Sequence, residues 1–189
     1  MLRCPMNTKI LCACERTQVL QQAWRKAGFD AWSCDLDSCY GLDPEHHIQG
    51  DCFAVLNDFD YVFAFPPCTH LSYANGAHLA EKISDGRTAA AVKIFYRLYK
   101  RHNVVMLENP LGIIGSLIPY TQIVSPDDFG SSKKKRTCLW LKGLPPLLPT
   151  TCRAGKSYIQ SLSSGSFRRS ELDPFLAAAM VDQWSDYVQ

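Results

Sequence analysis

The sequence YVFAFPPCTH, at residues 61–70, joins a short apolar run to two prolines and a cysteine. The aromatic and β-branched residues of its first half are typical of a buried strand, and the prolines end that strand because proline donates no hydrogen bond to a neighbouring strand. In an open α/β sheet, ligands bind at the edge formed by the carboxyl ends of the strands. We therefore expect Cys68 to face a ligand. The simpler alternative is a small, reduced and partly buried cysteine.

Length and composition describe an ordinary globular domain. The chain has 189 residues, of which 47% are hydrophobic and 20% charged, and its formal net charge is +2. This size supports one full hydrophobic core without disulfides or metal ions. No apolar run approaches the ~20 residues of a membrane span, and no signal peptide is recognised at the amino terminus. We therefore interpret the nine cysteines as reduced thiols of a cytoplasmic protein.

The spacing of apolar residues predicts alternating strands and helices. Strands are expected at residues 9–14, 29–34, 61–65, 103–107, 121–124 and 137–141, and helices at 17–27, 53–56, 88–102, 111–118 and 173–187. Residues 40–47 are interpreted as a loop, and residues 69–87 as a long, mobile loop of the kind that often forms a lid. The alternation predicts a mostly parallel sheet with helices on both faces.

Polar groups also follow a second predicted strand. Glu108-Asn109-Pro110 comes directly after the strand at 103–107, so polar groups again precede a proline. We expect this segment at the same edge of the sheet as Cys68. The basic run Lys133-Lys134-Lys135-Arg136 precedes the strand at 137–141. Charge alone leaves open whether this run contacts phosphates or is a solvated surface.

Four short segments follow one another in a defined order. They are PPC at 66–68, ENP at 108–110, FG at 129–130 and KRT-x-LWL at 135–141. As a set they resemble the ordered motifs of the cytosine-C5 DNA methyltransferases. The chain is also similar to short phage-encoded proteins of that type, which share the run CLWLKGLPPL found at 138–147. The resemblance spans about residues 9–149.

The resemblance implies the fold and its extent. We expect a Rossmann-like class I methyltransferase fold in a single α/β domain over residues 1–189. Within it, the motifs occupy residues 9–149, a variable region follows at 150–172, and a helix at 173–187 closes the domain.

The resemblance further implies covalent chemistry on a pyrimidine ring. Cytosine C5 is a weak nucleophile, so a thiolate, here that of Cys68, first adds to C6 and creates carbanion character at C5. Glu108 would hold ring N3 and the exocyclic amine and share a proton with N3, because burial raises the pKa of a carboxyl group. Arg136, with Lys135 as the alternative, would contact the O2 side of the ring and a phosphate. Further substrate-binding residues would be Pro67, Thr69 and Asn109.

The methyl donor implied by the resemblance is S-adenosylmethionine. Asp35 would bind the ribose hydroxyls and Asp51 the adenine amine, at the ends of the second and third strands. Glu15 would reach the amino group of the methionine part, and Cys14 and Pro66 would complete the cofactor site. The family has a glycine-rich first loop, whereas this chain has ACERT at 13–17. The alternative is that both aspartates cap turns and that Glu15 caps a helix.

The segment available for recognising a substrate is short. Family members carry a target-recognition region before the last helix and flip the base out of the duplex, whereas this chain has only about residues 149–173 there. DNA, RNA and a free pyrimidine nucleotide therefore stay open as substrates. The alternative function is that of a non-catalytic or cofactor-independent phage protein, which would use the same fold in the host cytoplasm to bind nucleic acid, a nucleotide or a host defence protein.

The first half of the chain admits one further interpretation, a zinc site. Its candidate ligands are Cys12, Cys14, Cys34, Cys39, His46, His47 and Cys52. The paired Cys-x2-Cys spacing that is typical of structural zinc sites does not occur among them. We therefore expect no metal.

Overall fold

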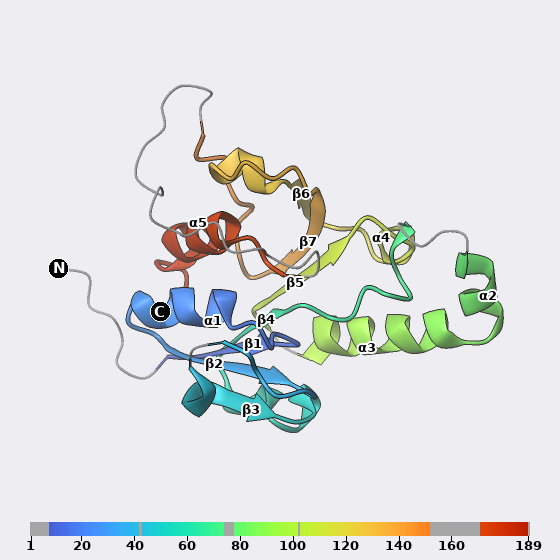
Figure 1. Ribbon diagram of the computed structural model, residues 1–189, viewed down its shortest axis with the longest axis horizontal. Helices are drawn as coiled ribbons and strands as arrows, with labels where there is room; N and C mark the ends of the chain where they lie inside the picture. The colour runs from blue at the N-terminus through green and yellow to red at the C-terminus, as the bar shows by residue number, and fades with distance from the viewer. Residues whose placement is uncertain (1–7, 42, 74–77, 102, 152–170, 189) are drawn as a thin grey trace.

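The computed structural model describes residues 8–41, 43–73, 78–101, 103–151 and 171–188, which form one seven-stranded sheet (Figure 1). The strands are β1 (Lys9–Ala13), β2 (Asp30–Asp35), β3 (His47–Gln49), β4 (Tyr61–Ala64), β5 (Val105–Pro110), β6 (Gln122–Val124) and β7 (Thr137–Lys142). They lie in the order β3-β2-β1-β4-β5-β7-β6. The first five are parallel to their neighbours, whereas β7 is antiparallel to both β5 and β6. This order, with one reversed strand, is that of the Rossmann-like class I methyltransferase fold, which confirms the predicted fold class.

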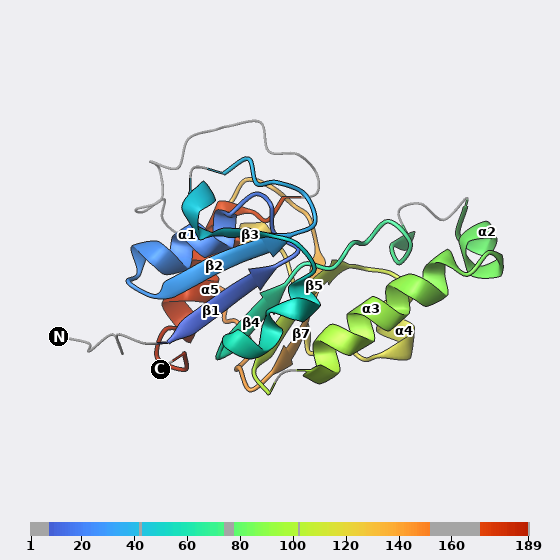
Figure 2. The same ribbon diagram turned by 90° about the horizontal axis from the view of Figure 1, so that it is seen from below.

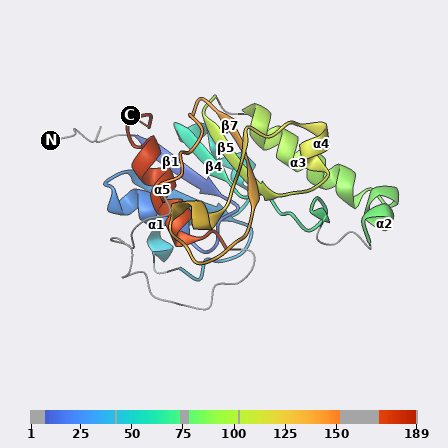
Figure 3. The same cartoon turned by 90° about the horizontal axis from the view of Figure 1, so that it is seen from above.

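Helices cover both faces of the sheet. The helices α1 (Val19–Lys26) and α5 (Pro174–Trp184) lie side by side on one face, as the view from above shows (Figure 3). The helices α3 (Arg87–Arg101) and α4 (Ile114–Leu117) pack on the other, and α2 (Leu79–Ser84) contacts α3 at its far end (Figure 2). Successive side chains of a strand point to opposite faces. On β4, Val62 therefore belongs to the α3 side and Phe63 to the α1 side.

A chain of buried aromatic rings joins α1, the sheet and α5. Trp24 lies 5.0 Å from Phe29 and 5.2 Å from Phe63, measured between ring centroids, and Phe63 stacks on Trp184 at 5.9 Å. Trp184 Nε1 donates a hydrogen bond of 2.9 Å to the carbonyl oxygen of Pro145. Fully buried aromatic side chains remove large apolar areas from water, so this group is a main source of stability for the α1 face.

Three differences from the predicted elements concern short or irregular segments. The loop predicted at 69–87 contains α2, whose apolar residues pack on α3 and not on the sheet, so the loop prediction was wrong for residues 79–84. Residues 74–77 of that loop lie outside the described residues. The edge strand β3 has three residues, too few for a visible alternation. The predicted helix at 53–56 consists of two 3-10 turns, Cys52–Ala54 and Leu56–Asp58.

The strand β5 is longer than predicted. We expected it to end at Leu107, but it pairs with β7 as far as Pro110, which lies opposite Thr137. The pairing continues because β7 is antiparallel and lies on the outer side of β5. Most of the predicted variable region, residues 152–170, lies outside the described residues. Among those described, no helix is both long and apolar enough to cross a lipid bilayer.

Candidate active site

The turn after β4 is held by both neighbouring strands. Phe65 N donates a hydrogen bond of 2.9 Å to the carbonyl oxygen of Ala13 on β1, and Asn109 Nδ2 on β5 donates one of 2.7 Å to that of Pro66. The backbone amides of residues 71 and 72 then donate to the carbonyl oxygen of Cys68. Cys68 is therefore fixed at the carboxyl edge of the sheet, where its side chain is partly exposed.

Pro67 and Thr69 lie exposed on either side of Cys68. The carbonyl oxygen of Thr69 accepts a hydrogen bond of 2.9 Å from Lys82 Nζ on α2. Lys82 is only 7% exposed, which is unusual for a lysine. The helix α2 thus supports the cysteine loop, a role for which the sequence carried no signal.

Glu108 lies on the strand next to the cysteine turn. Its carboxyl group is partly buried, and the hydroxyl group of Thr137 on β7 lies within hydrogen-bond distance of it. The same hydroxyl lies 3.0 Å from the carbonyl oxygen of Asn109. Burial raises the pKa of Glu108, while the Thr137 hydroxyl and the Lys135 charge act in the opposite direction. Glu108 is therefore a carboxyl group that keeps its proton to a higher pH than usual.

Cys68, Glu108 and Lys135 act on one another electrostatically. Burial is the main reason why the pKa of Cys68 is raised, and the negative charge of Glu108 adds to it. The positive charge of Lys135 opposes the increase at both groups. The two strands β4 and β5 are hydrogen-bonded neighbours, with Ala64 opposite Leu107. The sheet thus brings together a thiol, a carboxyl group and an ammonium group, as the motif order predicted for Cys68 and Glu108.

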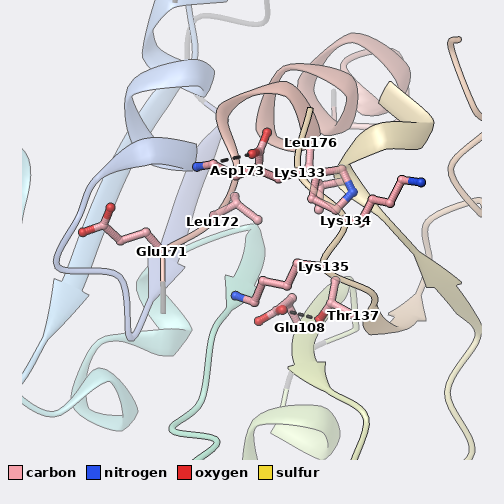
Figure 4. Close-up of a pocket in the computed structure, with 10 residues that line it drawn as sticks. Glu108, Lys133, Lys134, Lys135, Thr137, Glu171, Leu172, Asp173 and Leu176 are labelled. Atoms are coloured by element: carbon pink, nitrogen blue, oxygen red, sulfur yellow. Dashed lines mark hydrogen bonds and ion pairs between the residues drawn. The ribbon is translucent and has the colours of Figure 1, made fainter. Parts of the chain in front are cut away.

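A cavity of about 430 Å³ opens beside Glu108 (Figure 4). One wall carries Glu108, Thr137 and the three lysines at 133–135, and the other consists of residues at and before the start of α5, among them Leu172 and Leu176. Figure 4 shows Lys135 lying over Glu108, whereas Lys134 points away from it. This volume falls within the range of small-molecule sites. The cavity combines one apolar wall with one that is both basic and acidic.

The structure places Arg136 differently from our first choice. Arg136 lines a separate hollow of about 400 Å³ together with Lys134, Asp127 and Asp128. Adjacent residues of an extended segment point in opposite directions. With Thr137 turned toward Glu108, the residue two positions earlier, Lys135, shares its side, and Arg136 does not.

The basic run is tied to the start of α5. Asp173 Oδ1 accepts a hydrogen bond of 3.0 Å from Phe175 N and so caps this helix. Its other oxygen accepts one of 3.0 Å from Ser131 Oγ and lies 3.9 Å from Lys133 Nζ. Of the three lysines, Lys133 therefore has a structural partner, and the loop at 131–133 moves together with α5.

The first turn after β1 is built without glycine. Cys14 takes the left-handed conformation, with φ of 58°, which glycine adopts more easily. Glu15 is only 3% exposed, and its two carboxylate oxygens accept hydrogen bonds from Leu20 N (2.6 Å) and Gln21 N (3.1 Å). Burial raises its pKa to about 7. Glu15 thus holds the first turn of α1, which is the helix-capping alternative, and it points away from the edge where a cofactor amine was expected.

Asp35 and Asp51 remain at the carboxyl edge, beside Cys14. Asp35 Oδ1 accepts a hydrogen bond of 3.1 Å from Asp37 N, and Asp51 Oδ1 accepts one of 3.0 Å from Phe53 N, so both cap turns. Asp35 is partly and Asp51 largely exposed. Pro66, the last residue of the predicted cofactor set, is buried and faces β5 through its carbonyl oxygen.

Comparisons with known proteins add little to this description. No protein-family model and no curated protein matches the chain. Among solved structures, it is similar to the methyltransferase EhMeth of Entamoeba histolytica, at 14% identity and a TM-score of 0.48 over 74% of this chain and 54% of that one. It is also similar to a mutant of DNMT2 from Spodoptera frugiperda, at 14% identity and a TM-score of 0.42 over 77% of this chain and 54% of that one. The chain thus spans about half of the length of both structures.

Proposed function

We propose that the chain is an S-adenosylmethionine-dependent methyltransferase that acts on C5 of a cytosine through a covalent bond to Cys68. The observation that carries this proposal is the grouping of Cys68, Glu108 and Lys135 beside one cavity. A thiol next to a carboxyl group that retains its proton is the pair that addition to a pyrimidine ring needs. A module that only binds nucleic acid needs neither group.

The chain's own residues would divide the reaction between them. The Cys68 thiolate adds to ring C6, and the Lys135 charge favours that thiolate because it lowers the pKa of Cys68. Glu108 donates its proton toward ring N3 as negative charge develops on the ring, and so makes C5 nucleophilic. Asn109 keeps the cysteine turn at the correct distance through its bond to Pro66. Loss of the C5 proton and elimination of the thiolate then release Cys68.

The described residues fit the proposed cofactor in part. S-adenosylmethionine, when bound, would supply an electrophilic methyl group. Asp35 and Asp51 lie at adjacent strand ends, where they would hold a ribose diol and an adenine amine, and the left-handed Cys14 makes the tight turn that glycine makes elsewhere. Glu15 does not fit as a ligand of the methionine amine, because both of its oxygens accept helix amides.

Two experiments test the proposal independently. Calorimetric titration with S-adenosylmethionine is expected to show micromolar binding that the Asp35→Ala variant loses. Oligonucleotides with 5-fluorocytosine are expected to become covalently attached to the protein, because fluorine cannot leave C5 as a proton does and the Cys68 adduct cannot eliminate. Single-stranded, double-stranded and RNA versions of the same sequence, together with 5-fluoro-dCMP, distinguish the substrate classes.

The matched control for the covalent test is Cys68→Ala, which is expected to form no adduct. An adduct that survives this substitution would move the nucleophile to another residue and overturn the proposal. One observation, the glycine-free first turn with Glu15 directed inward, favours the alternative of a cofactor-independent protein on the same fold. Adduct formation by a wild-type protein that does not bind S-adenosylmethionine at millimolar concentration would select that alternative.

A further inference from the structure

Three thiols gather at the carboxyl ends of β1, β2 and β3. Cys14 follows β1, Cys34 is the penultimate residue of β2, and Cys52 begins the 3-10 turn after β3. Cys34 and Cys52 belong to the same buried group of side chains, and Cys14 packs against it. Strand pairing fixes this arrangement, since Ala13 lies opposite Cys34 and Cys34 lies opposite Ile48. The cluster is therefore a consequence of the sheet and not of a flexible loop.

Within the cluster, Cys14 and Cys52 are directly paired. Their thiols hydrogen-bond to each other. Cys34 has a different partner, because its Sγ donates to the carbonyl oxygen of Gly50 at 3.5 Å. In the part of the chain that the structure describes, no group of three or more histidine, cysteine or acidic side chains is arranged to hold a metal ion. The zinc interpretation of these cysteines therefore has no support, and the chemistry left to them is with each other.

We propose that Cys14 and Cys52 form a reversible disulfide when the protein meets a hydroperoxide. The Cys52 thiolate attacks one oxygen of the peroxide, which breaks the O–O bond and leaves a sulfenic acid and hydroxide. The Cys14 sulfur then attacks the sulfenic sulfur, the S–S bond forms, and the second oxygen leaves as water. Overall, two thiols and one hydrogen peroxide give one disulfide and two water molecules, with two electrons passing from sulfur to oxygen.

The surroundings of the three thiols assign their roles. The hydrogen bond from Cys14 lowers the pKa of the Cys52 thiol, which makes Cys52 the first to react. Burial raises the pKa of Cys34 to about 12, and Cys34 is fully buried within the ladder of β2. Cys14 is partly exposed, and it lies one residue beyond the end of β1. Cys14 is therefore free to follow Cys52, whereas Cys34 is not.

The disulfide would act on the proposed cofactor site, and this consequence rests on the proposed function. Cys14 and Cys52 lie beside Asp35 and Asp51, the two carboxylates proposed to hold the cofactor. A covalent bond would tie the first turn to the 3-10 turn after β3 across that edge. We expect the oxidised protein to bind S-adenosylmethionine at least tenfold more weakly than the reduced protein.

Peptide mapping tests the disulfide without any ligand. The reduced, full-length protein is treated with a small molar excess of hydrogen peroxide, free thiols are alkylated, and the digest is analysed by mass spectrometry. A Cys14–Cys52 linked peptide is expected, and dithiothreitol should remove it. The link should be absent from Cys14→Ser and from Cys52→Ser. It should persist in Cys39→Ser, which changes a partly exposed cysteine outside the cluster.

Each other outcome counts against part of the proposal. A link that involves Cys34, or a Cys52 that goes on to sulfinic acid with Cys14 still alkylated, would overturn the assignment of the pair. Unchanged cofactor affinity of the cross-linked protein, measured by calorimetry, would overturn the regulatory consequence. If the reduced protein does not bind S-adenosylmethionine, the proposed function loses its cofactor, but the peptide map still decides whether the disulfide forms.

Discussion

The hydroxyl group of Thr137 lies between two acceptors, the Glu108 carboxyl group and the carbonyl oxygen of Asn109. A hydroxyl group has one proton and can donate to only one of them at a time. Both contacts become hydrogen bonds if Glu108 is protonated and donates to Thr137 Oγ1, which then donates to the Asn109 carbonyl. Burial of Glu108, which raises its pKa, favours the same state. Thr137 therefore helps to keep on Glu108 the proton that the proposed reaction uses.

Replacing Thr137 tests this relationship. In Thr137→Val the side chain keeps its shape, but Glu108 loses its partner, and we expect covalent attachment to 5-fluorocytosine DNA to slow by roughly tenfold to a hundredfold. Thr137→Ser retains the hydroxyl and is expected to stay within about threefold of wild type, the usual context-dependent spread. Single-turnover rates of adduct formation measure both variants. A valine variant that reacts at the wild-type rate would limit Thr137 to packing.

Cys68 should matter for chemistry much more than for stability. Cys68→Ser is expected to abolish turnover and to change the free energy of unfolding by less than about 1 kcal/mol, because the side chain is partly exposed. Cys138→Ser is the matched comparison, since Cys138 is only 1% exposed. It should cost roughly 1–3 kcal/mol, the penalty for burying an additional polar group. Urea denaturation gives both values, and a larger loss in Cys68→Ser than in Cys138→Ser would support the core-cysteine interpretation.

Lys135 and Arg136 are adjacent and are expected to differ in effect. Removing the Lys135 charge raises the pKa of Cys68, which that charge now lowers, so the pH profile of adduct formation by Lys135→Ala should move to higher pH. Arg136→Ala should leave the profile unchanged, because Arg136 lines the other hollow. If Arg136 contacts phosphate, its removal flattens the salt dependence of nucleic-acid binding. A shifted profile in Arg136→Ala alone would restore our first choice.

Glu15 gives the fold a dependence on pH. Burial raises the pKa of Glu15 from 4.5 to about 7, so between these values the folded state keeps a proton that the unfolded state has lost. The stabilisation is complete below about pH 4.5 and is lost as the pH rises through about 7. The difference corresponds to about 3 kcal/mol.

The Glu15→Gln variant tests this dependence, because glutamine does not titrate. Its free energy of unfolding, from urea titrations between pH 4.5 and 8, should decrease less over this range than that of the wild type. Glu45→Gln, on an exposed side chain, is the control. Equal slopes for wild type and Glu15→Gln would show that Glu15 is already ionised at the lower pH.

The parts of the fold that the sequence predicted are those governed by local pattern. The apolar run of β4 and the two prolines after it placed Cys68 at the carboxyl edge, and the structure bears this placement out. The strand β5 was predicted too short, because its last three residues owe their strand geometry to pairing with β7. Pairing between segments distant in the chain is not visible in either segment alone.

Side-chain direction at the site was harder to predict than position. The choice between Lys135 and Arg136 depends on the register that sets Pro110 opposite Thr137, and a one-residue shift would exchange their sides. Glu15 was expected at the cofactor edge, but the unpaired amides at the start of α1 attract its carboxylate more strongly than solvent does. Both outcomes were set by backbone hydrogen bonds that the sequence motif does not encode.

The contact between α1 and α5 has a consequence for synthesis of the chain. The apolar side of α1, with Leu20 and Trp24, is covered by α5, yet residues 27–173 are translated between the two helices. At typical elongation rates this interval lasts on the order of ten seconds. During it, the nascent chain presents an apolar surface on the ribosome with nothing of its own to cover it. Early recruitment of a chaperone to α1, or aggregation when translation pauses before α5, would follow directly from this order of synthesis.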